Sequence, residues 1–221
     1  MEHPFIPYDP VHFAEAEMIK RSKEFYEFMD RRRSVRDFSN EDVPEEVIRN
    51  IIQTASTAPS GAHKQPWTFC VVRNTELKHR LRLLAEEEEK KNYAGRMSDR
   101  WIKDLEPLGT NEVKEFLDIA PWIIVVMKKS YDLDSDGGKT NNYYVNESVG
   151  IACGFLIAAI HNAGLVTLTH TPSPMNFIAK ALDRPEEEKP YLLLPVGYPK
   201  KGCKVPDLKR KTYDEVAIYF E

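Results

Sequence analysis

The chain has 221 residues, enough for one sizeable domain with a buried core, and its 42% hydrophobic and 30% charged residues are ordinary for a globular protein. The formal net charge of −4 argues against a general nucleic-acid-binding protein, which usually has a basic domain. The three cysteines stand far apart, so reduced thiols in a cytoplasmic protein are expected, and no histidine or cysteine spacing predicts a metal site.

Hydrophobic periodicity predicts helices that alternate with strands along the chain. In chain order, the predicted elements are a helix over 10–32, a helix over 42–58, a strand over 67–72, a helix over 76–93, a strand over 122–127, a helix over 142–162, a strand over 165–171, a helix over 174–182 and a strand over 191–196. Residues 132–139 are polar and contain glycine, which indicates a loop. The alternation favours an α/β or α+β fold with a layered sheet.

Local signals predict two of the helix ends. Asp42 is a candidate cap for the helix that follows it, with Pro44 in the first turn and Glu45 three residues after the cap. Gly164 is a candidate C-terminal cap for the long helix over 142–162.

The two ends of the chain raise different expectations. The first ten residues lack the pattern of a signal peptide, and the longest apolar run, 149–160, is shorter than the about 20 residues that cross a bilayer, so we expect no membrane contact. At the other end, an apolar strand with Val216, Ile218 and Phe220 follows a charged stretch and has no helix after it. One explanation is that this strand pairs with a second chain, which a monomer at micromolar concentration would contradict.

Two basic clusters are candidate anion sites. Arg31–Arg36 holds four arginines, whose guanidinium groups match phosphate oxygens, and Ser34 adds a hydroxyl donor. The alternative is a solvated basic turn at a helix end, where positive charge complements the helix dipole. Lys209–Lys211 alone reads as a solvated charge run. Our hypothesis is that the two clusters converge on one phosphate.

Two uncharged segments also have the composition of a binding site. The small residues of the loop over 58–67 let a ligand approach the backbone closely, although a tight connection explains them equally well. Residues 167–172 place hydroxyls at a strand end before a proline, or they are ordinary β-branched strand residues. The sequence contains neither a glycine-rich phosphate loop nor a G-x-S-x-G nucleophile motif.

Several of these segments resemble a known family. The Arg-Arg-Ser-Val-Arg run at 32–36 and the loop that runs into Pro66-Trp67 resemble the FMN-phosphate turn and flavin loop of the nitroreductase superfamily. His63 stands where general nitroreductases usually carry Asn, and the chain is more similar to the iodotyrosine deiodinase branch. The segments that resemble that branch, which together cover nearly the whole chain from about Met18, are 58–63, 86–89, 92–93, 96–97, 100–101, 110–114, 143–144, 151–154, 162–167, 194–199 and 205–211.

The resemblance implies an α+β, nitroreductase-like fold with a central mixed sheet flanked by helices. It also implies one FMN-binding domain over 1–221 in a domain-swapped homodimer whose active sites lie at the subunit interface. A lid would span about 86–115, and a dimer-exchanging tail would span about 205–221.

The resemblance also implies a role for each site residue. The FMN phosphate and ribityl chain would be held by Arg32, Arg33, Ser34, Arg36 and Arg210. The flavin would be contacted by Pro59, Ser60 and Gly61 of the partner subunit, with Thr169 donating to flavin N5 as the catalytic residue and His170 and Thr171 lining the ring. The substrate would be bound by Ala62, whose backbone N–H receives the phenolate, and by Glu89, Tyr93 and Lys114, which hold the amino acid zwitterion.

The zwitterion assignment also makes chemical sense by itself. Glu89 and Tyr93 are four residues apart and so share one face of a helix. A carboxylate accepts from an ammonium group, while the ammonium of Lys114 and a phenol hydroxyl donate to a carboxylate. Without the resemblance, the charge run at Glu86–Lys91 reads as a solvated helix face.

The implied activity is FMN-dependent reductive dehalogenation of 3-iodotyrosine and 3,5-diiodotyrosine to tyrosine and halide by single-electron steps. The electrons would come from a reductase or directly from NADH or NADPH. One alternative is a general NAD(P)H-dependent nitroreductase or flavin reductase, and another is a non-catalytic flavin- or halotyrosine-binding protein. The sequence feature that separates the first alternative is the set Glu89, Tyr93 and Lys114.

Overall fold

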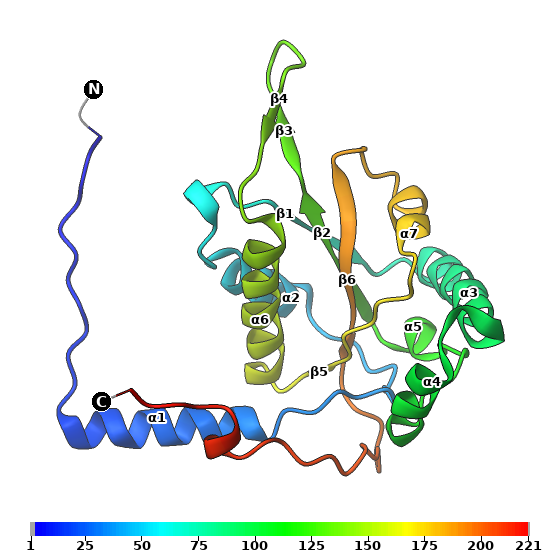
Figure 1. Cartoon of the computed structure of the whole chain (residues 1–221), viewed down its shortest axis with the longest axis horizontal. Coiled ribbons are helices and arrows are strands. Elements are labelled where there is room, and N and C mark those ends of the chain that lie inside the picture. The colour runs from blue at the N-terminus through cyan, green and yellow to red at the C-terminus, as the bar shows by residue number, and fades with distance from the viewer. Residues whose placement is uncertain (1–2, 221) are drawn as a thin grey trace. The chain divides into compact units, whose positions relative to one another are not determined.

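A four-stranded sheet forms the centre of the molecule in a computed structural model that describes residues 3–220 (Figure 1). Its strands run in the order β1 (Trp67–Val72), β2 (Trp122–Lys129), β6 (Glu188–Gly197) and β5 (Val166–Thr167). All three pairs between these strands are antiparallel. The parallel component of the predicted mixed sheet is a single bridge between Ser34 and Thr167.

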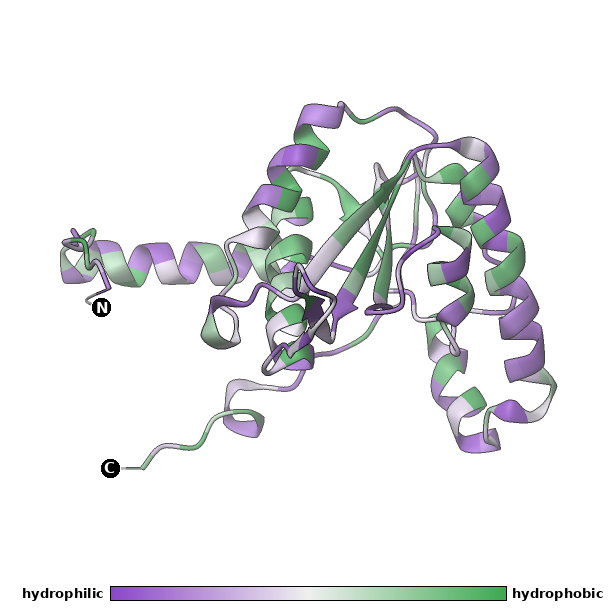
Figure 2. Cartoon of the chain, turned by 90° about the horizontal axis from the view of Figure 1, so that it is seen from above, coloured by the Kyte–Doolittle hydropathy of each residue, from purple (hydrophilic) through white to green (hydrophobic). Residues whose placement is uncertain are grey.

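Helices cover both faces of this sheet. Figure 1 shows α2 (Glu45–Ser56) and α6 (Val145–Asn162) on one side and α3 (Thr75–Lys91), α5 (Phe116–Ile119) and α7 (Asn176–Ala181) on the other. The sheet therefore has two hydrophobic surfaces to bury, and Figure 2 shows hydrophobic residues on the helix sides that face it. This arrangement confirms the α+β class.

Strand β2 supplies one row of side chains to each of two cores. Successive residues of a strand point to opposite faces, so Ile124 packs with the α2 and α6 side and Ile123 with the α3 and α5 side. Six consecutive residues of β2 are buried, which explains why its sequence is a continuous apolar run and does not alternate.

The remaining elements are short. They are η1 (Gly61–His63), the π-helical turn η2 (Asn92–Arg96), α4 (Asp99–Leu105), η3 (Glu106–Leu108), β3 (Tyr131–Leu133), β4 (Lys139–Asn141) and η4 (Tyr213–Glu215). The chain divides into two compact units, the first ending at Arg32 and the second beginning at Arg33. The first unit contains α1 (Glu15–Asp30), none of whose residues is buried.

Only part of the predicted strand over 165–171 pairs with a neighbouring strand. Val166 and Thr167 pair with β6, and His170 pairs with Leu193 in the same register through two backbone hydrogen bonds of 2.9 and 3.0 Å. The position between these pairs on β6 is occupied by Pro195, which has no N–H to donate. This proline explains the interruption, and the interruption leaves Leu168 and Thr169 without ladder pairing.

Three of the predicted boundaries are wrong. The helix α2 begins at Glu45 without a side-chain cap, because Asp42 is paired with Arg73 at 2.8 Å. Residues 132, 133 and 139 of the predicted loop belong to the β3–β4 hairpin, whose strands have only three residues each and are partly buried. The C-terminal tail contains η4 and no strand among its described residues, so its apolar side chains remain exposed.

The predicted cap of α6 is confirmed. Gly164 adopts the left-handed region with φ of 76°. Its N–H donates to His161 O, and the N–H of Leu165 donates to Ile160 O, which is the Schellman arrangement of a helix C-terminus. The turn directs the chain from α6 straight into β5.

Candidate active site

One face of α3 and η2 is aligned with residues 110–118 along its whole length. Four residues at helical spacing form this face: Arg82, Glu86, Glu89 and Tyr93. Arg82 donates to Asp118 Oδ2 at 2.8 Å at one end, and Tyr93 donates to Thr110 O at 3.2 Å at the other. The two segments therefore run antiparallel, with Lys114 between their ends.

Lys114 is the centre of this alignment. Its side chain is buried, with a residue exposure of 3%. Its Nζ lies 3.5 Å from Glu89 Oε2 and donates to Thr110 Oγ1 at 3.3 Å and to Asn111 O. The structure thus brings together Glu89, Tyr93 and Lys114, the three residues that the sequence assigns to an amino acid ligand.

Burial shifts the titration of two of these groups. Desolvation lowers the pKa of the Lys114 ammonium, and the carboxylate of Glu89 opposes that shift. Desolvation raises the pKa of the Tyr93 hydroxyl, and Glu89 raises it further. The Tyr93 hydroxyl is therefore a proton donor throughout the neutral range, and Glu89 and Lys114 form a partly desolvated ion pair.

Arg36 connects the arginine-rich turn to this cluster. It lines a cavity of about 400 Å³ with Thr110, Asn111 and Phe116. Its side chain is half-buried, and desolvation lowers the pKa of the guanidinium. Within residues 3–220 no carboxylate forms an ion pair with Arg36, so the structure holds a partly desolvated cation that has room for an external anion.

The rest of the turn runs beside the threonine strand. Val35 donates its N–H to Thr167 O at 3.1 Å, and Ser34 bridges Thr167. The Arg33 guanidinium donates to Pro206 O, which ties the turn to the segment that leads to the second basic cluster. Arg210 itself is exposed, and Arg32 is the last residue of the first unit.

The threonine strand presents two faces. Leu168, His170 and Pro172 are buried, whereas Thr169 and Thr171 are exposed. His170 packs edge-on against the ring of Phe116 at 5.5 Å between centroids. The structure therefore places Thr169 and Thr171 together and places His170 on the opposite side.

His170 is a neutral imidazole in a cationic surrounding. Burial, together with the charges of Lys114 and Arg36, lowers the pKa of His170 to about 3. Its Nε2 is buried and has no hydrogen-bond partner among the described residues. A group that stays uncharged lies next to two cations without adding to their repulsion.

The loop that contains Ala62 has a strained backbone. Ala62, His63 and Gln65 adopt positive φ angles of 48°, 55° and 49°, which is uncommon for residues with side chains and concentrates at functional sites. Gly61 is required by close approach, because a Cβ there would lie 2.8 Å from Tyr143 O. The loop is held against the start of α6, where Gly61 N donates to Ser148 Oγ at 3.2 Å.

The predicted site residues therefore form two groups in one chain. The lid group lies on the α3 and α5 side of the sheet and includes Arg36, Glu89, Tyr93 and Lys114. The loop group lies at the start of α6 on the other side and contains Pro59, Ser60, Gly61 and Ala62 (Figure 1). One chain does not bring these two groups together.

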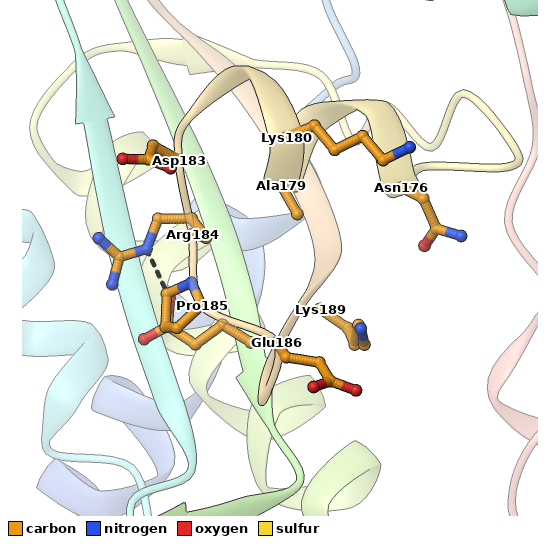
Figure 3. Close-up of a pocket in the computed structure, with 9 residues that line it drawn as sticks. Asn176, Ala179, Lys180, Asp183, Arg184, Pro185, Glu186 and Lys189 are labelled. Atoms are coloured by element: carbon orange, nitrogen blue, oxygen red, sulfur yellow. Dashed lines mark hydrogen bonds and ion pairs between the residues drawn. The ribbon is translucent and has the colours of Figure 1, made fainter.

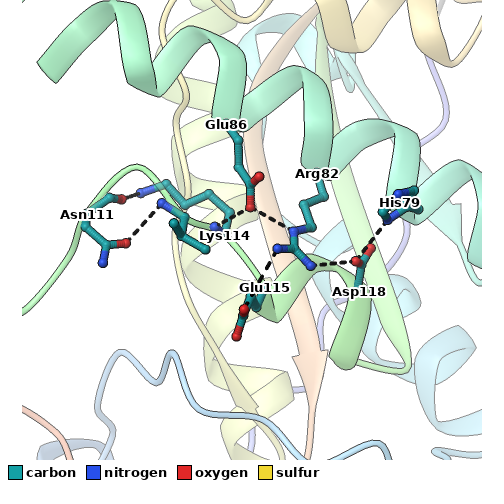
Figure 4. A network of polar contacts seen from close by, with 8 residues as sticks. His79, Arg82, Glu86, Asn111, Lys114, Glu115 and Asp118 are labelled. Atoms are coloured by element: carbon teal, nitrogen blue, oxygen red, sulfur yellow. Dashed lines mark hydrogen bonds and ion pairs between the residues drawn. The ribbon is translucent and has the colours of Figure 1, made fainter. Parts of the chain in front are cut away.

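Sequence reasoning missed the polar residues behind Lys114. Glu86, Arg82 and Asp118 form a continuous network between α3 and α5, which Figure 4 shows. The signal was present, since 82, 86, 89 and 93 share one helical face. It was hidden in a run of glutamates and lysines that has the composition of a solvated surface.

A second cavity, of about 490 Å³, lies at α7 and the start of β6 (Figure 3). Its lining includes Lys180, Arg184 and Lys189 together with acidic residues, and Arg184 Nε is paired with Glu188 Oε2 at 2.7 Å. None of the predicted site residues lines it. Its charges are balanced within the chain, unlike the guanidinium of Arg36.

Two general properties narrow the kind of site. In the part of the chain that the structure describes, no helix is both long and apolar enough to cross a membrane. Across residues 3–220, no group of three or more histidine, cysteine, aspartate or glutamate side chains is arranged to hold a metal ion.

Comparison with known proteins gives consistent results. The family model described as "Nitroreductase family" matches residues 29–198. The chain is 60% identical to an iodotyrosine deiodinase of Haliscomenobacter hydrossis over 216 residues, which are 98% of this chain and 97% of that protein. It is 52% identical to human iodotyrosine deiodinase 1 over 219 residues, which are 99% of this chain and 75% of that protein.

Solved structures agree with these sequence matches. A crystal structure of oxidized iodotyrosine deiodinase bound to FMN and 3-iodo-L-tyrosine superimposes with a TM-score of 0.77 at 29% identity, covering 88% of this chain and 100% of that one. A BluB-like flavoprotein from Clostridium difficile 630 has a TM-score of 0.68 at 20% identity, covering 89% and 98%, and shows the shared fold alone.

Proposed function

The chain belongs to the nitroreductase family and, within it, to the iodotyrosine deiodinases, and on that premise we propose that it is an FMN-dependent oxidoreductase that removes halide from halotyrosines. Its substrates are 3-iodotyrosine and 3,5-diiodotyrosine, and its products are tyrosine and iodide. The observation that carries this proposal is the convergence of Glu89, Tyr93 and Lys114 on one buried point.

The lid group has the charges that an amino acid zwitterion needs. Glu89 takes the substrate ammonium, while Lys114 and the Tyr93 hydroxyl donate to the substrate carboxylate. In the structure Glu89 and Lys114 face each other at 3.5 Å, so each is already oriented toward the position of an opposite charge. A zwitterion exchanges this long ion pair for two charge-assisted contacts, which favours an amino acid over a simple halophenol.

The arginine-rich turn fits the phosphate of FMN. The turn that contains Arg33, Ser34 and Arg36 runs beside Thr167 in space. Among the described residues, no carboxylate forms an ion pair with Arg36. Arg32 and Arg210 complete the set that we assign to the phosphate and the ribityl chain. FMN, when bound, supplies the electrons of the reduction, and the chain supplies binding and orientation.

The exposed residues Thr169 and Thr171 face the flavin. Thr169 is the residue that we assign to flavin N5, because its side chain is exposed and its hydroxyl can donate. In our assignment His170 supports this strand from its buried side and contacts the ring through the backbone. The backbone N–H of Ala62 donates to the substrate phenolate in our assignment, from a residue of η1 whose left-handed φ of 48° departs from helical geometry.

The loop group reaches the flavin from a second copy of the chain, in a domain-swapped homodimer. Within one chain, Pro59–Ala62 lies at the start of α6, away from the lid group. The exposed apolar residues around that helix fit a partner surface: Tyr143, Tyr144, Ile151 and Phe155. The tail offers Val216, Ile218 and Phe220, all exposed, for exchange with the partner.

The remaining parts of the proposal concern the cell. The electrons come from a reductase or directly from NAD(P)H. A cytoplasmic location is consistent with Cys70, Cys153 and Cys203, all of which are free thiols. The 86–115 region acts as a lid over the bound substrate, and residues 1–221 act as one FMN-binding unit.

A titration separates this function from a general nitroreductase or flavin reductase. The oxidised FMN-bound protein is titrated with 3-iodotyrosine while flavin fluorescence is followed, and iodide is then measured after reduction with dithionite. We expect quenching at low ligand concentration and release of one iodide per 3-iodotyrosine. Reduction of nitroaromatics by NADPH, with neither flavin quenching nor iodide release on addition of 3-iodotyrosine, would contradict the proposal. Flavin quenching without iodide release would indicate a binding protein.

A further inference from the structure

Glu86 contacts the backbone of Lys114, the residue that we assign to the substrate carboxylate. Its Oε1 accepts a hydrogen bond from the Lys114 N–H at 2.8 Å and a second from Arg82 Nε at 2.7 Å. The two donors come from different segments, one from the 110–118 region and the other from α3 itself. One carboxylate oxygen therefore joins the lid segment to the helix (Figure 4).

Arg82 holds that carboxylate in place. Its Nη1 donates to Asp118 Oδ2 at 2.8 Å, and Asp118 also contacts His79 Nδ1 at 3.0 Å. The guanidinium thus bridges Glu86 and Asp118, which fixes the spacing of α3 and α5. Lys78 extends the same junction by donating to Ala120 O at 2.7 Å.

Glu86 is mostly buried, at 9% residue exposure, so its contacts are energetically significant. Burial by itself would raise the pKa of the Glu86 carboxyl, but the hydrogen bonds from the Lys114 amide and Arg82 lower it below its usual value. The group is therefore an anion at neutral pH. A buried N–H that loses a charged acceptor is left unsatisfied, and the backbone that carries it shifts to find another partner.

We infer that Glu86, clamped by Arg82, is a positioning residue that holds the backbone of Lys114 so that its ammonium lies opposite Glu89 at the place of the substrate carboxylate. This inference rests on the proposed role of Lys114 in substrate binding. Glu86 and Glu89 are three residues apart on α3. The same rigid helix therefore holds Lys114, which binds the substrate carboxylate, and Glu89, which binds the substrate ammonium. The position of the substrate is thereby set by α3.

The geometry also identifies a matched control. Glu87 is the next residue on α3, but it faces solvent with a side-chain exposure of 62% and pairs only with Lys91 among the described residues. A change of Glu87 to Gln removes the same charge from the same helix without touching the 110–118 segment. Any general effect of helix charge or lid electrostatics appears in both variants.

The test compares Glu86→Gln with Glu87→Gln in the FMN-bound protein, using two ligands. One ligand is 3-iodotyrosine, and the other is 2-iodophenol, which has the halophenol ring but no carboxylate for Lys114. A Gln amide cannot accept from both donors with the strength of a carboxylate. We expect Glu86→Gln to raise the Kd of 3-iodotyrosine about tenfold, as for other outer partners that orient a binding group. The Kd values of 2-iodophenol and FMN change less than about twofold, as do all values for Glu87→Gln.

A double-mutant cycle identifies the route of the effect. Combined with Lys114→Met, the Glu86→Gln change should weaken 3-iodotyrosine binding by less than about twofold more, because two residues that act as a unit are not additive. Additive losses, equal losses for both ligands, or equal losses for Glu86→Gln and Glu87→Gln would overturn the inference. Failure of the unaltered protein to bind 3-iodotyrosine would instead overturn the proposed function.

A second variant covers the case in which Glu86→Gln unfolds, which thermal unfolding would reveal. Arg82→Lys keeps the positive charge but cannot bridge Glu86 and Asp118 with a planar fork. It should raise the Kd of 3-iodotyrosine by about threefold while that of 2-iodophenol is unchanged, since the charge that remains still faces Glu86. An unchanged Kd for both ligands in a folded Arg82→Lys protein would also contradict the inference.

Discussion

Around Lys114, the polar groups that we assign to the substrate have partners in the same chain, whereas the loop of Pro59–Ala62 presents a strained and exposed backbone. In the lid group, Glu89 lies on α3, and the backbone of Lys114 is tied to the same helix because its N–H donates to Glu86, which also accepts from Arg82. The loop group is held against α6 through the hydrogen bond from Gly61 N to Ser148 Oγ. Under the proposed function, one chain supplies the whole zwitterion site, whereas the loop group contacts the flavin of another copy.

The largest effect is expected where the exposed face of α6 is altered. Phe155 is 39% exposed, and Phe155→Glu would place a charge in the proposed dimer interface, where burial of an unpaired carboxylate is costly. We expect dimerisation to weaken by more than about a hundredfold, with loss of FMN, as measured by analytical ultracentrifugation and flavin absorbance.

The control for that change is Leu83→Glu. Leu83 is 52% exposed on α3, so the substitution has the same chemistry on a helix face that we do not assign to the interface. The Leu83→Glu protein should remain dimeric and yellow. If the two variants behaved alike, or if the unaltered protein were a monomer at micromolar concentration, the distinction between the two groups would be lost.

The next effect concerns the lid group alone. Lys114→Met leaves Glu89 without its partner and removes the donor to the substrate carboxylate. Truncation of one member of a buried charge pair costs about 2–5 kcal/mol, so the Kd of 3-iodotyrosine should rise by about a hundredfold or more. Flavin fluorescence titration measures it, and the exposed Lys103→Met is the control. Equal losses of FMN and 3-iodotyrosine affinity would show that the lid is misplaced.

A smaller effect tests the link between the arginine-rich turn and the lid group. Arg36→Gln removes the half-buried guanidinium that faces the 400 Å³ cavity. A charge-assisted hydrogen bond contributes about 1.5–3 kcal/mol, so FMN binding should weaken about tenfold or somewhat more. The exposed Arg49, which lies 3.6 Å from Glu45, gives the matched control Arg49→Gln. Retention of FMN by the Arg36→Gln protein would remove Arg36 from the phosphate site.

The same contrast explains what the sequence could predict. The sheet and its flanking helices follow from apolar periodicity, and the strand over 122–127 is predictable because its six buried residues form a continuous apolar run in the sequence. The lid residues were found only through resemblance, since the composition of Glu86–Lys91 is that of a solvated helix. Glu86 differs from Glu87 in the direction of its side chain: helical spacing places Glu86 on one face with Arg82 and Glu89, but the composition of the run does not show that this face is buried.

Errors in the sequence reading arise where tertiary contacts override local signals. Asp42 has the sequence of a helix cap but pairs with Arg73, which lies 31 residues later. The tail after Pro206 has the alternation of a strand but pairs with no strand among the described residues of its own chain. Such a tail is explained if its partner edge belongs to a second copy, as the proposed exchange requires.

The smallest expected effect is on the pH dependence of stability, and it arises from His170. Burial beside Lys114 and Arg36 lowers the pKa of His170 to about 3, below the usual value of 6.5. The unfolded chain therefore binds a proton that the folded chain does not, and the contribution of His170 to stability, present above pH 6.5, is lost as the pH falls toward 3. The slope is at most about 1.4 kcal/mol per pH unit.

Urea unfolding at pH 7 and pH 5 measures that slope. His170→Asn keeps a polar side chain that does not titrate, so the variant should lose less stability than the unaltered protein between the two pH values. The exposed His12→Asn should leave the difference unchanged. If His170→Asn had the same pH dependence as the unaltered protein, His170 would titrate alike in the folded and the unfolded chain. Burial beside Lys114 and Arg36 would then not keep the imidazole of His170 neutral.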